Sequence, residues 1–310
     1  MISSFFGKTK PINYIVLAIF LFLFYFSNVF LGLREQKIND VIPFELLTFV
    51  VLLLGIFIIN QMVRTEKITD FNSYTILFFV LLVTAFSENL QLKNAIFTNF
   101  FLLLALWRLL SIKSIRNVKH KIFDASLLIA VASLFYDWAL VFLLVVFVVS
   151  NLYDRKTFKN WLVPMVGVAT IFILTFTILK VNGSLDFFRE HYQFSLGIFK
   201  TDSFFEVLNV KALIYILFAL AVAFVVFLRL RNVGGGKLLQ LRVIFLAFVL
   251  GVAITLLTPA DESPVLITFF PASVFMANYF EAIKKAKHRE AILIICTVLS
   301  LLLFVLQMNH

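Results

Sequence analysis

The residues of this chain best suited to chemistry are carboxylates at the ends of long apolar segments. A carboxylate can act as a general base toward a hydroxyl group when it lies within hydrogen-bond reach of it. Ionisable groups beside hydrophobic segments are costly in lipid and are therefore functional candidates. These acidic residues are Asp40, Glu45, Glu88, Asp137, Asp261 and Glu262.

Two of these carboxylates, Asp40 and Asp137, are the candidate catalytic residues. Each stands between two apolar segments, where a cavity that opens toward water would collect polar groups. The alternative interpretation of each is an ordinary solvated charge at the end of a segment. The candidate substrate-binding residues are Glu88, Arg189, His191 and Glu262.

Several chemistries have no support in the sequence. The single cysteine, Cys296, lies in an apolar segment, and no His, Cys and Glu spacing is typical of a metal site. The triplet Gly234–Gly236 lacks the spacing and the lysine of a phosphate-binding loop. We therefore expect no metal and no cofactor. We also expect no nucleic-acid partner, because no basic patch coincides with a soluble module.

The elements that must position these residues are transmembrane helices. The chain has 310 residues, of which 62% are hydrophobic and 14% charged, and its mean hydropathy is +1.02. Its apolar runs approach the length that crosses about 30 Å of hydrocarbon. Open strands cannot satisfy their backbone in lipid, so these runs are helices. The prediction is an all-α, polytopic bundle that forms a single integral membrane domain over residues 1–310.

About eleven spans are expected. They lie near residues 12–33, 44–62, 73–88, 94–110, 122–135, 138–152, 161–181, 211–229, 242–258, 264–281 and 290–308.

Lysine and arginine clusters occur at every second junction between these segments. Under the positive-inside rule such junctions face the cytoplasm. With the cluster at Lys8 and Lys10 inside, 20 of the 27 Lys and Arg residues fall on the cytoplasmic side. The predicted N-terminus is therefore inside and the C-terminus outside. The predicted location is the inner, cytoplasmic membrane of a bacterium, and the first segment is a retained span because it is too long for a signal peptide.

Two segments leave alternatives open. Residues 122–152 form either one long helix or a hairpin of two short helices broken at Tyr136–Trp138. The charge bias favours the hairpin, whose arms are either full spans or re-entrant. The outer stretch 182–210 mixes apolar and charged residues, which indicates an amphipathic loop that either lies on the leaflet or forms a lid over the bundle.

The layout of the hairpin carries a resemblance to a known class of enzyme. Residues 127–168 contain a short helix, a polar tip, a second short helix, Asp154–Lys156 and a new span from Trp161. This order resembles the central hairpin of C-type membrane glycosyltransferases, which use polyprenyl-phosphate-linked sugars. The resemblance implies that Asp40, in the first outer loop, is the base or metal ligand for an acceptor. It also implies polyprenyl phosphate as the lipid partner.

The whole chain is also similar to a multi-pass inner-membrane family of flavobacteria that has no assigned activity. The similarity lies in the opening Met1–Gly7, followed by Lys8 and Pro11, and in Phe269–Pro271 before Asn278.

Three functions remain open from the sequence. The first is handling or transfer of a polyprenyl-phosphate-linked glycan at the periplasmic face, with Arg189 as a phosphate clamp. The second is a non-catalytic membrane subunit of an envelope secretion, motility or cell-wall assembly complex, with envelope proteins as partners. The third is a transporter, for which the ten glycines and six prolines offer few of the broken helices that such proteins use.

Overall fold

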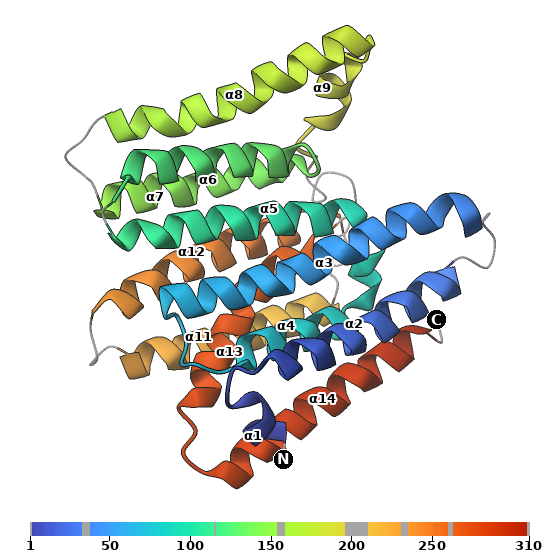
Figure 1. Ribbon diagram of the computed structural model, residues 1–310, viewed down its shortest axis with the longest axis vertical. Helices are drawn as coiled ribbons and strands as arrows, with labels where there is room; N and C mark the ends of the chain where they lie inside the picture. Colours follow the sequence, from blue (N-terminus) through green and yellow to red (C-terminus); the bar gives the residue numbers. More distant parts are fainter. Residues whose placement is uncertain are drawn as a thin grey trace.

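The computed structural model describes residues 2–32, 38–114, 116–153, 159–195, 210–230, 235–259 and 263–308. For residues 30–32, 38–41, 159–160 and 308 it describes the backbone alone. Within these ranges the chain is all-α, as predicted, and contains thirteen α-helices. Most of the long helices run alongside one another, whereas α13 crosses them steeply (Figure 1).

The α-helices are α1 (Ile2–Phe6), α2 (Pro11–Gly32), α3 (Ile38–Glu66), α4 (Tyr74–Ala85), α5 (Lys93–Leu110), α6 (Val118–Ser133), α7 (Leu143–Tyr153), α8 (Lys159–Asn182), α9 (Asp186–His191), α11 (Val210–Leu230), α12 (Gly236–Leu257), α13 (Phe269–Glu281) and α14 (Ala286–Met308). Short 3-10 helices are η2 (Ser87–Leu90), η3 (Ser111–Ser114), η4 (Asp137–Phe142) and η7 (Val265–Thr268).

Seven helices are long and apolar enough to cross a membrane. They are α2, α3, α5, α8, α11, α12 and α14. Shorter apolar helical stretches cover Tyr74–Ala85, Asp137–Tyr153 and Val265–Glu281. Every predicted segment coincides with a helix, but the total of eleven spans and their orientation in a membrane stay predictions.

The centre of the bundle is formed by α4 and α13, which are apolar around their whole circumference. Nearly every residue of both helices is buried. They pack directly against each other, with the rings of Tyr74 and Phe280 4.6 Å apart. A helix buried on all sides needs no polar face, so these two helices lack the amphipathic pattern of a soluble protein.

The outer helices expose large apolar side chains. Ile19 on α2 is 55% exposed, Ile295 on α14 is 63% exposed, and Val181 on α8 is 82% exposed. Contiguous exposed apolar surface of this extent is unfavourable in water and suits contact with lipid. α8 lies at the edge of the bundle beside α6 and α7 (Figure 1).

The hairpin prediction for residues 122–152 is confirmed, and the alternative of one long helix is wrong. α6 ends at Ser133, a turn follows, and η4 begins at Asp137 and leads into α7, which returns along α6. A backbone break at this point frees polar groups, which explains why the tip carries tyrosine, aspartate and tryptophan rather than aliphatic residues.

The chain begins with α1, which the sequence analysis did not anticipate. The backbone N–H groups of Ile2 and Ser3 donate to the carboxylate of Glu290 at 2.6 and 3.0 Å. The hydroxyl of Tyr74 donates to the carbonyl of Ser3 at 2.7 Å. Gly7 is required here, because a Cβ atom would come within 2.8 Å of the Ser3 carbonyl oxygen.

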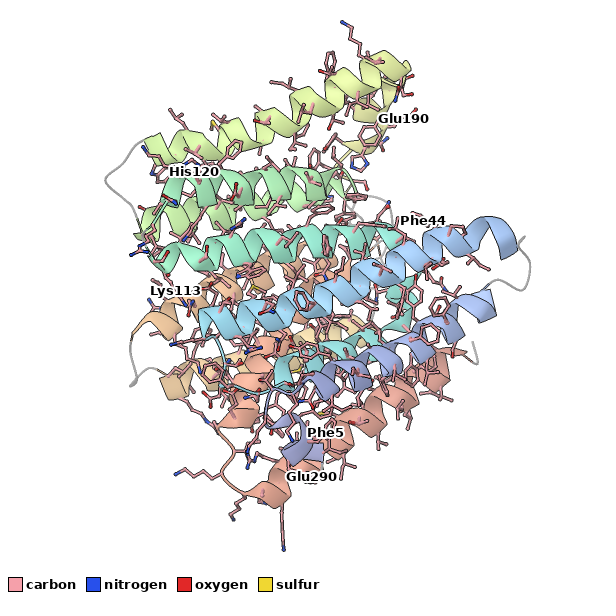
Figure 2. All side chains as sticks on the ribbon, in the orientation of Figure 1. Phe5, Phe44, Lys113, His120, Glu190 and Glu290 are labelled. Atoms are coloured by element: carbon pink, nitrogen blue, oxygen red, sulfur yellow. The ribbon has the colours of Figure 1, made fainter. Side chains whose placement is uncertain are left out.

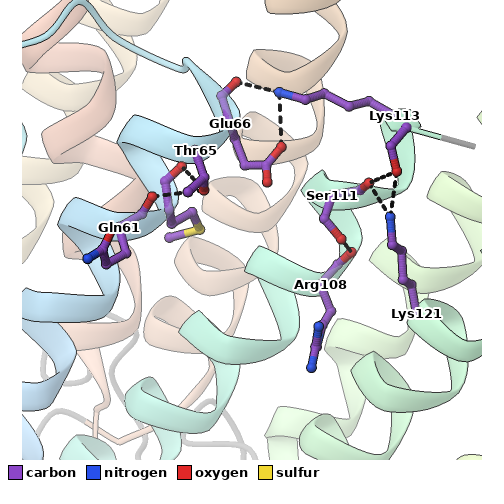
Figure 3. Close-up of polar contacts among 9 residues, drawn as sticks. Gln61, Thr65, Glu66, Arg108, Ser111, Lys113 and Lys121 are labelled. Atoms are coloured by element: carbon purple, nitrogen blue, oxygen red, sulfur yellow. Dashed lines mark hydrogen bonds and ion pairs between the residues drawn. The ribbon is translucent and has the colours of Figure 1, made fainter. Parts of the chain in front are cut away.

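The two ends of the bundle carry different chemistry. Figure 2 shows Lys113 and His120 at one end, and Phe44 and Glu190 at the other. At the first end Lys113 pairs with Glu66 at 2.9 Å and donates to its carbonyl, which joins η3 to α3 (Figure 3). Lys113 and His120 both lie at the junction between α5 and α6, one of the basic junctions predicted to be cytoplasmic.

Candidate functional site

A cavity of about 670 Å³ lies at the end of the bundle predicted to face outward. Four elements surround it: the N-terminal part of α3, the start of α5, the hairpin tip and the segment that contains α9. We call it the outer cavity. Its lining residues are Phe44, Gln91, Leu92, Lys93, Asn94, Ala95, Phe135, Tyr136, Asp137, Glu190, His191, Gln193 and Ser195.

Asp137 lies in the wall of the outer cavity at the start of η4. Its Oδ1 accepts from the backbone N–H of Trp138 at 2.7 Å, and its Oδ2 accepts from the backbone N–H of Phe194 at 2.7 Å. Phe194 has φ +47°, a left-handed conformation that a phenylalanine adopts only when its surroundings hold it. Each carboxylate oxygen of Asp137 therefore helps to hold the chain in place.

His191 lines the same cavity as Asp137. Its Nε2 lies 2.7 Å from the carbonyl oxygen of Ser133, and its ring stacks on Phe187 at 4.8 Å. A carbonyl oxygen only accepts, so Nε2 carries the proton. In the neutral ring Nδ1 is then the atom that can accept a hydrogen bond.

Tyr192 attaches the same segment to α6. Its hydroxyl lies 3.0 Å from Oγ of Ser133, which itself donates to the carbonyl of Ala130 at 2.7 Å. The Tyr192 hydroxyl must therefore be the donor. Burial raises the pKa of Tyr192, so the phenol stays neutral and keeps this proton near neutral pH.

The segment 191–195 thus covers the hairpin tip. The indole Nε1 of Trp138 also donates to the carbonyl of Ser195 at 3.3 Å, and its ring packs edge-on against Phe194 at 5.5 Å. Of the two interpretations of the outer stretch, these contacts favour the lid for its described part. The remaining residues of that stretch, 196–209, lie outside the described residues.

Lys93 supplies a cation to the cavity wall. Its ammonium group forms an ion pair with Oε2 of Glu45, to which the hydroxyl of Tyr25 also donates at 2.6 Å. The side chains of Lys93 and Glu45 are 18% and 10% exposed, so the pair is largely shielded from water. Glu45 was among the carboxylates that the sequence indicated, whereas Lys93 was not predicted. The sequence pattern that could have predicted this ion pair is a lysine at the start of one apolar segment and a glutamate near the start of another.

Glu88 does not belong to this cavity. Its carboxylate accepts from Gln307 on α14 at 2.8 Å and pairs with Lys211 on α11 at 3.4 Å. Ser87 donates to the amide oxygen of the same Gln307 at 2.6 Å. These contacts tie η2 to α14 and α11.

The other predicted site residues are placed only in part. Arg189 is exposed on α9 and is not among the residues that line the cavity. The backbone of Asp40 lies in α3, but its side chain lies outside the described residues, as does the whole of Glu262. Among the residues that the structure describes, no group of His, Cys, Asp and Glu could hold a metal ion.

The fold is typical of one class of protein. An all-α bundle with seven apolar helices of spanning length and with exposed apolar outer faces is compatible with an integral, multi-pass membrane protein.

Residues 15–310 match a family of unknown function, DUF6427, and the chain belongs to this family. No curated protein and no solved structure matches the chain. The similarity to a multi-pass family without assigned activity is consistent with this match. The flavobacterial origin and the likeness to C-type glycosyltransferases stay predictions.

Proposed function

We propose that the protein handles a polyprenyl-phosphate-linked glycan at the periplasmic face of the bacterial inner membrane, and that the outer cavity binds the glycan head group. The observation that carries this proposal is the lining of the cavity. It combines aromatic rings with amide side chains and a cation at one end of an apolar bundle.

Each part of that lining suits a part of the ligand. The rings of Phe44, Phe135 and Tyr136 offer apolar faces to the C–H groups of a sugar. The exposed amides of Asn94 and Gln193 can donate to and accept from sugar hydroxyl groups, and the exposed carboxylate of Glu190 can accept charge-assisted hydrogen bonds from such groups. Lys93, which is paired with Glu45, has a third N–H group that can donate to a phosphate oxygen. The volume of about 670 Å³ lies within the range of known ligand sites, and the exposed apolar helices provide a surface for the polyprenyl tail.

The geometry supports binding more directly than transfer. Each carboxylate oxygen of Asp137 accepts a hydrogen bond from a backbone N–H group, so this carboxylate holds the cavity wall in place and is less suited to act as a base. The base in a transferase version of the proposal is Asp40. An Asp40→Asn variant with normal protein level and normal function would exclude that version and leave the binding proposal intact.

The proposal is tested with a matched pair of carboxylates on α9. Glu190 lines the outer cavity, whereas Asp186, at the other end of the same short helix, does not. Both side chains are exposed, so neither change should affect folding. We expect Glu190→Gln combined with Asn94→Ala to weaken binding of a short-chain polyprenyl-phosphate sugar to the purified protein, and Asp186→Asn to leave it unchanged. Equal affinity in all three proteins would contradict the proposal.

A second candidate function is a non-catalytic subunit of an envelope complex. α8 favours it, because only 17% of its most apolar window is buried and because it stands at the edge of the bundle. A transmembrane helix of a partner could cover that face. Capture of a stoichiometric protein partner, together with no binding of lipid-linked glycan, would favour this function over the first.

A further inference from the structure

A second hollow lies at the opposite end of the bundle from the outer cavity, between α2 and α3. Its volume is about 460 Å³. We call it the α2–α3 groove. It lies near the C-terminal end of α3, at the end of the bundle that carries Lys8 and Lys10, so none of its lining residues belongs to the outer cavity.

One part of the groove is apolar and open to the side. This part is lined by Ile15 and Ala18 on α2 and by Leu53 and Phe57 on α3. The two residues on each helix are three or four positions apart, so they lie on the same face of that helix. Ile15 is 54% exposed and Phe57 is 53% exposed, so this part opens onto the apolar surface of the bundle. An acyl chain could lie against it.

The other part of the groove is polar and positively charged. Lys10 and Arg64 stand at its mouth with exposed side chains, and neither forms an ion pair with another described residue. α2 begins here at Pro11, so the positive end of its dipole adds to the two cations.

Buried polar groups in the groove lack partners. The hydroxyl oxygens of Tyr14 and Thr9 are inaccessible to water and make no hydrogen bond within the described chain. Asn60 is 4% exposed and lines the groove, and no side-chain hydrogen bond joins it to another described residue. The amide of Asn60 can donate to a ligand oxygen in the groove, whereas the two hydroxyl groups lie beneath its surface.

We propose that the α2–α3 groove binds one anionic phospholipid, with its phosphate between Lys10 and Arg64 and an acyl chain along Ile15 and Phe57. Two cations and an amide donor fit the oxygens of a phosphate, and the apolar part fits the chain attached to it. The proposal requires that the bundle spans a membrane, and it is independent of the glycan proposed for the outer cavity.

The test compares lipid retention in protein reconstituted with phosphatidylglycerol or phosphatidylcholine and measured by native mass spectrometry. We expect one phosphatidylglycerol to stay bound to the wild-type protein and phosphatidylcholine to dissociate. Each cation near an anionic lipid contributes about a fivefold factor in affinity, so the double variant Lys10→Gln, Arg64→Gln should bind roughly 25-fold more weakly.

The matched control removes two charges nearby without touching the groove. Lys8 and Lys67 are exposed at the same end of the bundle, but neither lines the groove. The double variant Lys8→Gln, Lys67→Gln should therefore retain the lipid. Equal losses in the two double variants would show that the lipid responds to overall charge, and would overturn the proposal.

Two further measurements separate the parts of the ligand. Ala18→Phe fills the apolar part without changing charge, and we expect it to release the lipid as well. Inorganic phosphate at millimolar concentration should fail to displace the bound phosphatidylglycerol. Displacement by phosphate, or full retention in the Ala18→Phe variant, would contradict a lipid as the ligand.

Discussion

The carboxylate of Asp137 accepts a hydrogen bond from the backbone N–H of Phe194, 57 residues further along the chain, at 2.7 Å. This contact joins the tip of the hairpin between α6 and α7 to the segment that follows α9. It closes one side of the outer cavity and holds Phe194 in its left-handed conformation. The residue that the sequence marked as a catalytic candidate is therefore an anchor of the cavity wall.

Loss of this anchor should loosen the segment 191–195 without unfolding the bundle. In an Asp137→Ala variant we expect faster hydrogen exchange at the amide of Phe194, because the removed bond to a charged group is worth about 1.5–3 kcal/mol. Exchange within α4 should not change. Asp186→Asn is the control, since its carboxylate is exposed and holds no described segment. Unchanged exchange at Phe194 in the Asp137→Ala variant would contradict the anchoring role.

The ion pair of Lys93 and Glu45 should show strong energetic coupling. Removal of one partner leaves the other charge largely shielded from water, so Lys93→Met should cost about 3 kcal/mol of stability. The double variant Lys93→Met, Glu45→Gln should be less destabilised than the sum of the two single variants. Thermal unfolding of the wild type, the two single variants and the double variant in detergent measures this coupling. If the stability losses of the single variants add up to that of the double variant, Lys93 and Glu45 are not energetically coupled.

Gly167 should be essential for the close approach of α8 to α6. A Cβ atom at this position would lie 2.8 Å from Cβ of Ser126 and 3.1 Å from the carbonyl oxygen of Phe123. Overpacking of this kind costs about 1–3 kcal/mol, so Gly167→Ala should lower the unfolding temperature. Gly236→Ala is the matched control, because nothing lies within 4 Å of a Cβ atom there. Equal stability of the two variants would place α8 further from α6 than described.

The predicted orientation can be measured with single cysteines in a Cys296→Ala background. Glu190 and Lys119 are both exposed and lie at opposite ends of the bundle. In intact cells a membrane-impermeant maleimide should label Glu190→Cys and should label Lys119→Cys only after permeabilisation. The reverse pattern would invert the topology and place the outer cavity in the cytoplasm.

The sequence was sufficient to predict the helical segments, because each is a long apolar run bounded by charged or turn-forming residues. The break at Tyr136–Trp138 was visible for the same reason, since three residues with polar atoms interrupt two apolar arms. α1 was not predicted. Its formation depends on Glu290, a residue at the far end of the chain, which accepts from the N–H groups of Ile2 and Ser3.

The candidate site was predicted only in part. Asp137 and His191 were expected to share the outer face, and they line one cavity. Glu88 was assigned to the same site because it has the same charge and lies on the same predicted side. Its contacts with Gln307 and Lys211 instead depend on how α14 and α11 pack. Sequence patterns indicate at which end of a helix a residue lies, but not which of several neighbouring helices it faces.

The most direct test of the central claim is native mass spectrometry of the protein extracted gently from its own membrane. The account predicts a bound mass equal to a polyprenyl phosphate that carries a sugar. That mass should be lost in the variant that combines Glu190→Gln with Asn94→Ala and kept in Asp186→Asn. A protein that carries no such lipid, or one whose glycolipid is retained equally in both variants, would contradict the assignment of the outer cavity as its binding site.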